Sequence, residues 1–324
     1  MKHTTEREPD MKVLLAGASG AIGMPLIRRL HAAGHDVLAL HRSPEGRARL
    51  AAAGTTPIRV DVLSTPALVR ALQGQRADAV ISEITALKKT PMSHKDMTAT
   101  NILRSKGTAN LIAAAHQLGA RRFLTQSMVF GYGYGDWGGR VLTEADQFGP
   151  PGHGRFEEHL AAMRSNEEQV LRADSLDGIA LRYGLVYGPG PASDTLIEGL
   201  RRRKLPIVRN SGVLPWVYVD DAAAAATVAA LEQATPGAAY NITDDEPVSL
   251  ATLMIVMARA IGAPRPRAVP GWLLATAPLA RAAVTGGLRV SSTRAKTELR
   301  WTLQAPTYRE GISLLARHYT QATA

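Results

Sequence analysis

The sequence predicts an α/β fold built on a doubly wound parallel sheet. Short runs rich in Val, Ile and Leu alternate with longer helical stretches, which is typical of βαβ units. A glycine-rich turn at residues 17–23 follows the first short run directly and opens a helix. These two observations exclude an all-β or all-α chain.

The expected strands are short and buried on both faces, as strands of a parallel sheet are. They cover residues 12–16, 36–40, 56–60, 79–82, 122–125 and 178–181. A first helix runs from near residue 20 to about 33, where Gly34 favours a helix end. Further helices are expected over 155–172, the alanine run 222–226 and the apolar stretch 272–284.

The pattern divides the 324 residues into three parts. Residues 1–10 are charged and predict a disordered tail. Residues 11–185 predict a Rossmann nucleotide-binding domain, and residues 186–324 a smaller mixed region that binds substrate and is interleaved with the sheet. The stretch 272–284 is interrupted by Pro278 and Arg281 and is too short to span a membrane.

The composition limits the kinds of ligand and partner that the chain is expected to bind. The chain has no cysteine, so disulfides and thiolate metal sites are excluded, and a cytoplasmic location is the default. The histidines show no metal-ligand spacing, and no metal is expected. The formal charge is +10, yet the basic residues are scattered except for 201–204, so no nucleic acid is expected. That basic run predicts a solvated helix end or, alternatively, contact with an anionic partner.

The glycine-rich turn has the spacing of a dinucleotide-binding loop. Gly17 permits a tight turn, Gly20 lets the backbone approach a pyrophosphate, and Gly23 lets the helix pack on the strand, while the helix N-terminus attracts phosphate. A turn without a ligand is the alternative. The residues expected to bind cofactor here are Gly17, Ser19, Gly20, Ala21, Ile22 and Gly23.

The end of the second strand distinguishes the two nicotinamide dinucleotides. An acidic residue there would hold a ribose 2′-hydroxyl, but this chain has Arg42 and Ser43, which favour the 2′-phosphate of NADP(H). A solvated Arg42 is the alternative. Asp61 and Val62, after the third strand, are placed to meet the adenine. Glu83, after the fourth, predicts either a ribose contact or a helix cap.

Several segments, in this order, resemble the extended or atypical branch of the short-chain dehydrogenase/reductase superfamily, with its NAD-dependent epimerase/dehydratase-like members. Asn101 with Gly107 and Thr108 is similar to the helix signature of that family. Residues 182–190, 216–221 and Asn241 resemble its later motifs. The resemblance implies that Leu185 and Val186 lie at the cofactor, with Leu185 replacing the asparagine of the family.

The chain departs from the family at the Tyr-x-x-x-Lys pair, which is missing. One alignment puts Leu160 and Arg164 at those positions, and a shift of one residue puts His159 and Met163 there. Arg164 is expected to hold the nicotinamide ribose. Near the serine position of the family, Ser127 or Gln126 is expected to hydrogen-bond a substrate carbonyl.

The sequence therefore predicts an NADPH-dependent ketoreductase for a small carbonyl substrate. Hydride comes from the cofactor, and the proton from His159, from ordered water, from an acidic substrate hydroxyl, or from one of Tyr132, Tyr134, Tyr183 and Tyr187. The aromatic loop 131–139 favours an aromatic or polyketide-type ketone of secondary metabolism, such as antibiotic biosynthesis. The alternatives are a catalytically silent NADP(H)-binding sensor or scaffold, and a sugar-nucleotide epimerase or dehydratase. The sequence leaves the oligomeric state undetermined.

Overall fold

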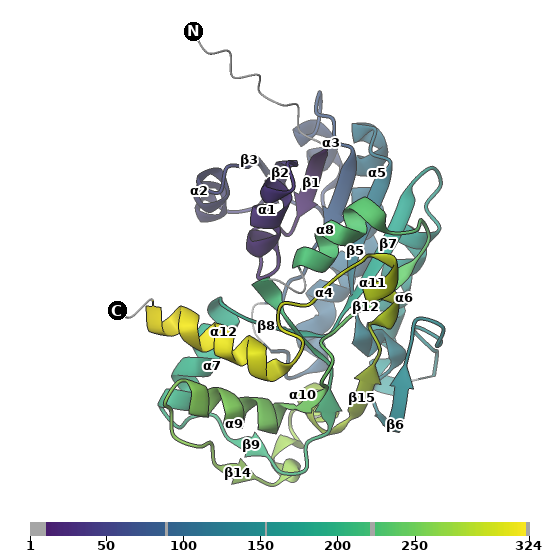
Figure 1. Cartoon of the computed structure of the whole chain (residues 1–324). Helices are drawn as coiled ribbons and strands as arrows, with labels where there is room; N and C mark the ends of the chain where they lie inside the picture. The colour runs from purple at the N-terminus through teal and green to yellow at the C-terminus, as the bar shows by residue number, and fades with distance from the viewer. Residues whose placement is uncertain (1–10, 88–89, 153, 221–223, 322–324) are drawn as a thin grey trace.

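A seven-stranded parallel sheet forms the centre of the computed structural model, which describes residues 11–87, 90–152, 154–220 and 224–321. The strand order is β3-β2-β1-β4-β5-β7-β12 (Figure 1). This is the order of a doubly wound fold. The strands are β1 (Lys12–Ala16), β2 (Asp36–His41), β3 (Thr56–Arg59), β4 (Ala79–Ser82), β5 (Arg122–Met128), β7 (Asp177–Tyr183) and β12 (Ala239–Ile242).

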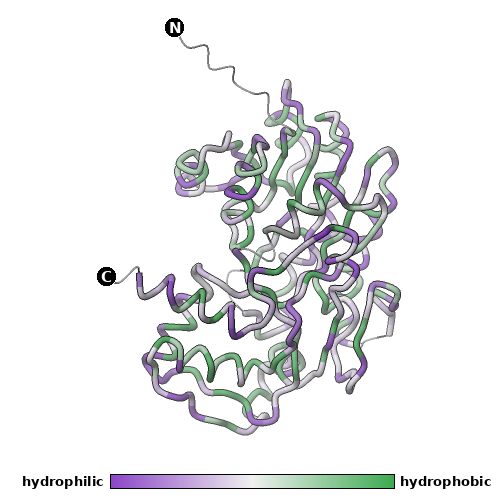
Figure 2. The backbone as a smooth tube through the Cα atoms, in the orientation of Figure 1, coloured by the Kyte–Doolittle hydropathy of each residue, from purple (hydrophilic) through white to green (hydrophobic). Residues whose placement is uncertain are grey.

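Alternate residues of each strand supply two hydrophobic cores, one on each face of the sheet. In β1, Val13 and Leu15 join one core, whereas Leu14 and Ala16 join the other. The first core is covered by α1 (Gly23–Ala32) and α8 (Ala224–Gln233), and the second by α3 (Thr65–Ala71) and α5 (Thr108–Leu118). Helix α6 (Glu157–Leu171) contributes side chains to both cores. Figure 2 shows hydrophobic residues running along the inner strands.

Two further helices lie at the edge where the strands end. Helix α2 (Pro44–Ala52) follows β2, and Ser43 caps it by accepting a hydrogen bond from the Gly46 amide. Helix α4 (Thr98–Ile102) continues through a π-helical turn, Leu103–Gly107, into α5. A short 3₁₀ helix, His94–Met97, precedes α4.

The C-terminal half of the chain adds small two-stranded sheets below the central sheet in Figure 1. The pairs are β8 with β11, β9 with β14, β10 with β13, and β6 with β15. The bounds are β6 (Asp136–Leu142), β8 (Leu185–Tyr187), β9 (Ile207–Val208), β10 (Val213–Leu214), β11 (Trp216–Tyr218), β13 (Val248–Ser249), β14 (Ala268–Val269), β15 (Gly287–Val290), α7 (Pro191–Arg201), α9 (Leu250–Ala260), α10 (Pro278–Thr285), α11 (Thr293–Glu298) and α12 (Tyr308–Gln321).

The structure corrects several expected bounds. Helix α1 begins at Gly23 and not near Gly20, because residues 17–22 form the turn. Strands β5 and β7 extend to Met128 and Tyr183, past the expected ends. The stretch 272–284 is not one helix but a 3₁₀ turn (Gly271–Leu274) followed by α10. Part of the aromatic loop expected over 131–139 is strand β6.

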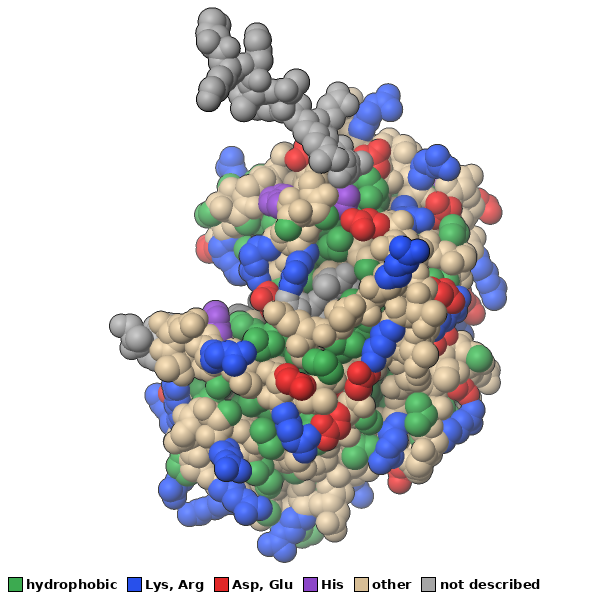
Figure 3. Space-filling view, in the orientation of Figure 1, with side chains coloured by type: hydrophobic (Ala, Val, Ile, Leu, Met, Phe, Trp, Pro, Cys, Tyr) green, Lys and Arg blue, Asp and Glu red, His purple; other side chains and the backbone are tan. Residues whose placement is uncertain are grey.

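Other expectations are met or lie outside the described residues. The basic run 201–204 is exposed at the end of α7, with Arg202 paired to Glu198. Figure 3 shows Lys and Arg scattered over the visible face among acidic groups. The predicted tail 1–10 and the start of the alanine run, 221–223, are not described. Within the described residues, no helix combines the length and hydropathy needed to cross a membrane.

Candidate active site

The turn between β1 and α1 is built to receive a diphosphate. Gly17 has φ +86°, and a Cβ there or at Gly23 would collide with a backbone oxygen, of Glu83 or Ala18 respectively. At Gly20 the nearest obstacle to a Cβ is the Gly17 carbonyl oxygen, 3.0 Å away, and the residue is exposed. The turn therefore stays tight on its inner side and open on its outer side, at the N-terminus of α1, as a dinucleotide requires.

The other predicted cofactor residues are spread along the same edge of the sheet. Exposed residues follow β1, β2 and β3 in turn, as expected for a ligand that crosses the carboxyl ends of parallel strands. They are Ser19, Ala21, Arg42, Ser43 and Asp61. Ile22 and Val62 are buried beneath them, and Leu185 and Val186 are half-buried in β8.

Glu83 lies at the end of β4 with its side chain directed into the protein. It is 5% exposed, its Oε1 accepts a hydrogen bond from the Tyr183 hydroxyl at 3.2 Å, and its Oε2 has no protein partner. Burial raises the pKa of Glu83 to about 8, so the carboxyl is held as a neutral acid. Within the described part of the chain, the carboxyl accepts a hydrogen bond only from Tyr183, so it caps no helix there.

Ser127 is held by a buried ion pair. Its hydroxyl donates to Glu167 Oε1 at 2.5 Å, and Glu167 also accepts from Arg182 Nε at 3.0 Å and from Arg182 Nη2 at 2.7 Å. All three residues are at most 5% exposed. Because the hydroxyl hydrogen of Ser127 is directed to Glu167, it is turned away from the edge where it was expected to meet a substrate carbonyl.

The same arginine fixes the loop after β5. Arg182 Nη1 donates to the Tyr132 hydroxyl at 2.9 Å, and Tyr132 donates to Asn241 Oδ1 at 2.9 Å. Burial raises the pKa of Tyr132 to about 12. Burial also raises the pKa of Tyr183 and of Tyr187. These three tyrosines are therefore poor proton donors to a substrate.

Gln126 points the opposite way from Ser127, as neighbours on a strand do. It is half-buried, and its side-chain amide has no hydrogen-bond partner among the described residues. Its backbone oxygen accepts from Asn166 Nδ2 at 3.0 Å, which ties β5 to α6. The amide is free to contact a ligand.

Arg164 is occupied by a loop. Its guanidinium donates to the Gly149 carbonyl oxygen and to Glu157, with Nη2 3.1 Å from Glu157 Oε1. The Gly149 backbone has φ +62° and lies against the side chain of Arg164. In the structure, Arg164 therefore binds residues 149 and 157. The predicted contact of Arg164 with the nicotinamide ribose stays a prediction.

His159 occupies the polar position of α6 at this edge. It is fully buried, its Nε2 lies 2.8 Å from His94 Nδ1, and its Nδ1 lies 2.9 Å from Asn101 Nδ2. Asn166 is level with the end of β5, and His159 is about two helical turns earlier, beyond that end of the strand. Leu160 instead packs in the hydrophobic core. The structure therefore favours the alignment that puts His159 where the family has tyrosine.

The contacts of His159 define its tautomer. Asn101 Nδ2 can only donate, so His159 Nδ1 accepts and the ring hydrogen is on Nε2, which donates to His94 Nδ1. His94 then carries its hydrogen on Nε2, a buried atom without a protein partner. Burial, His94 and Arg104 lower the pKa of His159, so its ring is neutral near neutral pH.

Arg104, on the π-helical turn, is a buried cation beside this pair. It is 8% exposed, and its Nη1 has no protein partner. It lies close enough to His159 to lower the pKa of that imidazole and close enough to Tyr134 to affect its phenol. Sequence reasoning missed both Arg104 and His94, because residues far apart in the chain form this cluster and no motif marks them.

Aromatic rings enclose the histidine pair. Tyr134 stacks on Phe130 and Phe156 with centroid separations of 5.3 and 4.5 Å, and His94 meets the Phe156 edge at 4.9 Å. His94 and Phe156 also line a pocket of about 220 Å³ against α10. The predicted aromatic loop therefore contributes Tyr134 to the surroundings of His94.

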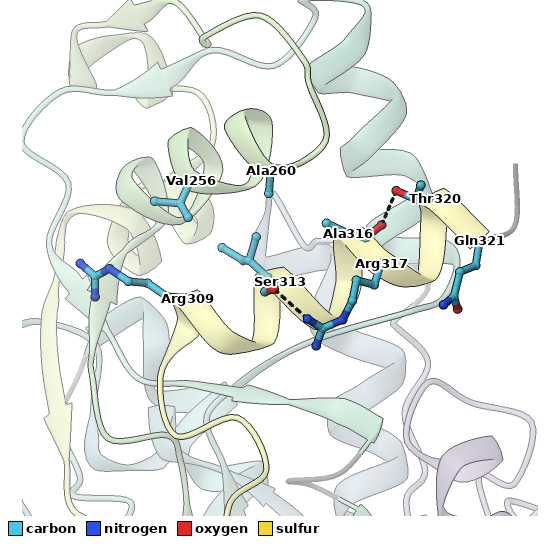
Figure 4. A pocket seen from close by; sticks show the side chains of 9 residues that line it. Val256, Ala260, Arg309, Ser313, Ala316, Arg317, Thr320 and Gln321 are labelled. Atoms are coloured by element: carbon cyan, nitrogen blue, oxygen red, sulfur yellow. Dashed lines mark hydrogen bonds between the residues drawn. The ribbon is translucent and has the colours of Figure 1, made fainter. Parts of the chain in front are cut away.

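A second pocket, of about 580 Å³, lies between α9 and α12 (Figure 4). Its walls include Val256, Ala260, Arg309, Ser313 and Arg317. None of the glycine-turn or histidine residues takes part, so this pocket is not the candidate active site. Among the described residues, no group of three or more His, Asp or Glu side chains could hold a metal ion.

Comparison with known proteins agrees with this geometry. Residues 13–243 match the model of the NAD dependent epimerase/dehydratase family. A 3-diazoavenalumate denitrifying reductase from Streptomyces sp is 34% identical, covering 93% of this chain and 99% of that protein. A 2-alkyl-3-oxoalkanoate reductase from Stenotrophomonas maltophilia is 32% identical, covering 79% of this chain and 77% of that protein.

The fold is also found in a solved structure. UDP-glucose 4-epimerase from Thermotoga maritima, determined with UDP-glucose, superposes with a TM-score of 0.79 at 20% identity, covering 97% of this chain and all of that one. The family match spans most of the chain, and the similar proteins named above include two reductases. The chain thus belongs to the NAD dependent epimerase/dehydratase family, within the extended short-chain dehydrogenase/reductases, and is an oxidoreductase that uses a nicotinamide dinucleotide.

Proposed function

We propose that this protein is an NADPH-dependent ketoreductase that reduces a carbonyl group on a small aromatic or polyketide-type molecule. The observation that carries the proposal is the His94–His159 pair at the end of β5, which supplies a proton donor where tyrosine is missing. The bound dinucleotide supplies hydride to the carbonyl carbon, and the carbonyl oxygen takes a proton to give the alcohol. By composition, we place the enzyme in the cytoplasm, and by substrate type in secondary metabolism.

The preference for NADPH rests on the end of β2. Arg42 is exposed there, and no acidic side chain stands between β2 and α2 to repel a 2′-phosphate. Ser43 caps α2, whose N-terminus adds favourable electrostatics for an anion. A guanidinium binds a phosphate through charge-assisted hydrogen bonds, so Arg42 is the residue we assign to the 2′-phosphate.

We assign the contacts with the substrate carbonyl oxygen to Gln126 and His94. The Gln126 amide is free to donate to the carbonyl oxygen, unlike the Ser127 hydroxyl. His94 Nε2 carries a hydrogen without a protein acceptor, and His159 Nε2 orients the ring through His94 Nδ1. The neutral His94 ring can therefore give its Nε2 hydrogen to the more basic alkoxide oxygen that hydride transfer creates, and it regains a hydrogen from solvent. Phe156 and Tyr134 offer faces to a planar substrate.

The test is consumption of NADPH by the purified chain with a panel of aryl ketones. We expect steady loss of NADPH absorbance and formation of the alcohol with at least one ketone, and slower turnover with NADH. Binding of NADPH without oxidation across the panel would contradict the proposal and favour a sensor or scaffold.

A second candidate is reductive removal of a diazo group, favoured by the 34% identity to the denitrifying reductase over nearly its whole length. In that reaction hydride adds to the ring carbon, the carbon–nitrogen bond breaks, and dinitrogen leaves with the bonding electrons. No oxygen needs a proton, so the reaction tolerates loss of the tyrosine. Nitrogen release from a diazophenol, unaffected by His94→Gln, would select this candidate over ketone reduction.

A further inference from the structure

We propose that Arg104 binds a carboxylate of the substrate, which makes the substrate a planar aromatic or conjugated acid. The inference rests on the proposed function because it names the substrate class of the same site. Arg104 is on the π-helical turn Leu103–Gly107, between α4 and α5. Turns of this type inside α-helices are frequent at functional sites.

The charge of Arg104 has no counter-ion among the residues that the structure describes. Arg104 is 8% exposed, and its Nη1 has no hydrogen-bond partner among the described residues. None of the ion pairs or hydrogen bonds among the described residues includes this guanidinium. A buried guanidinium without an anion costs several kcal/mol, so the site is built for an anion that arrives with a ligand.

The groups that face Arg104 do not supply that anion. From α6 it faces the neutral imidazole of His159, and from the loop after β5 it faces the phenol of Tyr134. Burial raises the pKa of Tyr134, so the phenol stays protonated. Burial lowers the pKa of Arg104 from a very high ordinary value, which leaves the guanidinium charged near neutral pH.

The position of Arg104 assigns the anion to the substrate and not to the cofactor diphosphate. Arg104 follows Asn101 by about one helical turn, and Asn101 contacts His159, the proton-donating end of the site. The diphosphate cradle lies at Gly17–Gly23, after β1. A cation at the proton-donating end meets the substrate.

Neighbouring atoms fit the same ligand. His94 Nε2 is a second unpartnered donor in this cluster, and the rings of Phe130, Tyr134 and Phe156 form a stacked apolar wall. A planar acid places its ring against these faces and its carboxylate on Arg104, with charge-assisted hydrogen bonds from the guanidinium.

The test measures binding, without turnover, to the full chain saturated with NADP⁺. The probes are 4-hydroxycinnamate and its neutral amide, titrated by calorimetry into wild type, Arg104→Met and Arg104→Lys. Arg172→Met, a change of an exposed arginine at the end of α6, is the matched control. We expect Arg104→Met to lower the affinity for the carboxylate probe at least about tenfold. The affinities for the amide and for NADP⁺ should change less than about threefold. Arg104→Lys should recover part of the loss.

Equal binding of the carboxylate and the amide by wild type would overturn the inference. An equal loss of affinity for both probes in Arg104→Met would also overturn it. A loss of affinity for NADP⁺ as large as the loss for the carboxylate would overturn it too, because Arg104 would then be a cofactor residue. If the carboxylate preference holds but neither a ketone nor a diazophenol is reduced, the proposed function fails and the anion site stands. Circular dichroism of each variant verifies that it is folded.

Discussion

His159 and His94 share a ring-to-ring hydrogen bond, with Nε2 of His159 2.8 Å from Nδ1 of His94. The bond orients His94 so that its Nε2 hydrogen is directed away from His159 and has no protein acceptor. The pair joins α6 to the 3₁₀ turn before α4, across 65 residues of sequence. In the proposed reaction this contact orients the proton donor that replaces the missing tyrosine of the family.

Replacing His94 by Gln should lower kcat for ketone reduction by about 10²-fold, because general acid catalysis contributes 10²–10⁴ in rate. The affinity for NADPH should not change, since the diphosphate cradle is separate. Steady-state kinetics and a fluorescence titration measure the two quantities. His116→Gln, at an exposed histidine, is the control. Unchanged kcat in His94→Gln would show that the proton comes from water or from the substrate.

Gln126→Leu should mainly lower activity, whereas Ser127→Ala should mainly lower stability. Gln126→Leu removes the free amide and should lower kcat/KM at least about tenfold with little change in Tm. Ser127→Ala removes a hydrogen bond to the buried Glu167 carboxylate and should cost about 1–3 kcal/mol of stability with a smaller effect on kcat. Thermal unfolding and kinetics on both variants give the answer. A large loss of kcat in Ser127→Ala at unchanged Tm would restore Ser127 as the residue that binds the carbonyl.

Arg42→Ala should lower the affinity for NADPH about tenfold or more and leave the affinity for NADH nearly unchanged, since only NADPH has the 2′-phosphate. Dissociation constants for both nucleotides measure the difference. Arg49→Ala, at an exposed arginine on α2, serves as the control. An equal loss for both nucleotides would mean that Arg42 contacts the part that they share.

Glu83→Gln should make the protein more stable, increasingly so as the pH rises from about 5 to about 8. The pKa of Glu83 is about 8 in the folded chain and near its ordinary value of 4.5 in the unfolded chain. Between these values the folded state binds more protons, so the stability of wild type falls with rising pH. The shift corresponds to roughly 3–5 kcal/mol at alkaline pH, and glutamine keeps an acceptor for Tyr183. Urea unfolding at several pH values measures it, and a difference that is constant with pH would contradict a neutral Glu83.

The sheet and the cofactor turn could be predicted from the sequence because local patterns determine them. Strands β1 and β4 have the expected bounds, since a short apolar run next to a glycine or a polar residue marks both ends. The ends of β5 and β7 were placed too early because Gln126, Ser127 and Arg182 are polar. Ser127 and Arg182 can lie in the strands because Glu167 pairs with both in the interior.

The catalytic cluster could be predicted only in part. The sequence offered His159 in one of two alignments, but it assigned no role to His94 or to Arg104. Both depend on the packing of α4 and its π-helical turn against α6, which no local pattern encodes. The partner of Arg164 is likewise a loop carbonyl, and nothing in the sequence marks it.

The most direct test of hydride transfer is to follow deuterium from NADPH that carries deuterium at both positions of the reactive carbon of its nicotinamide. The full chain is incubated with this NADPH and an aryl ketone that has a carboxylate, and the product is examined by mass spectrometry. The account predicts one deuterium on the carbinol carbon, a proton from solvent on the oxygen, and one NADPH consumed per alcohol. Product without deuterium, or no product from any ketone although NADPH is bound, would contradict it.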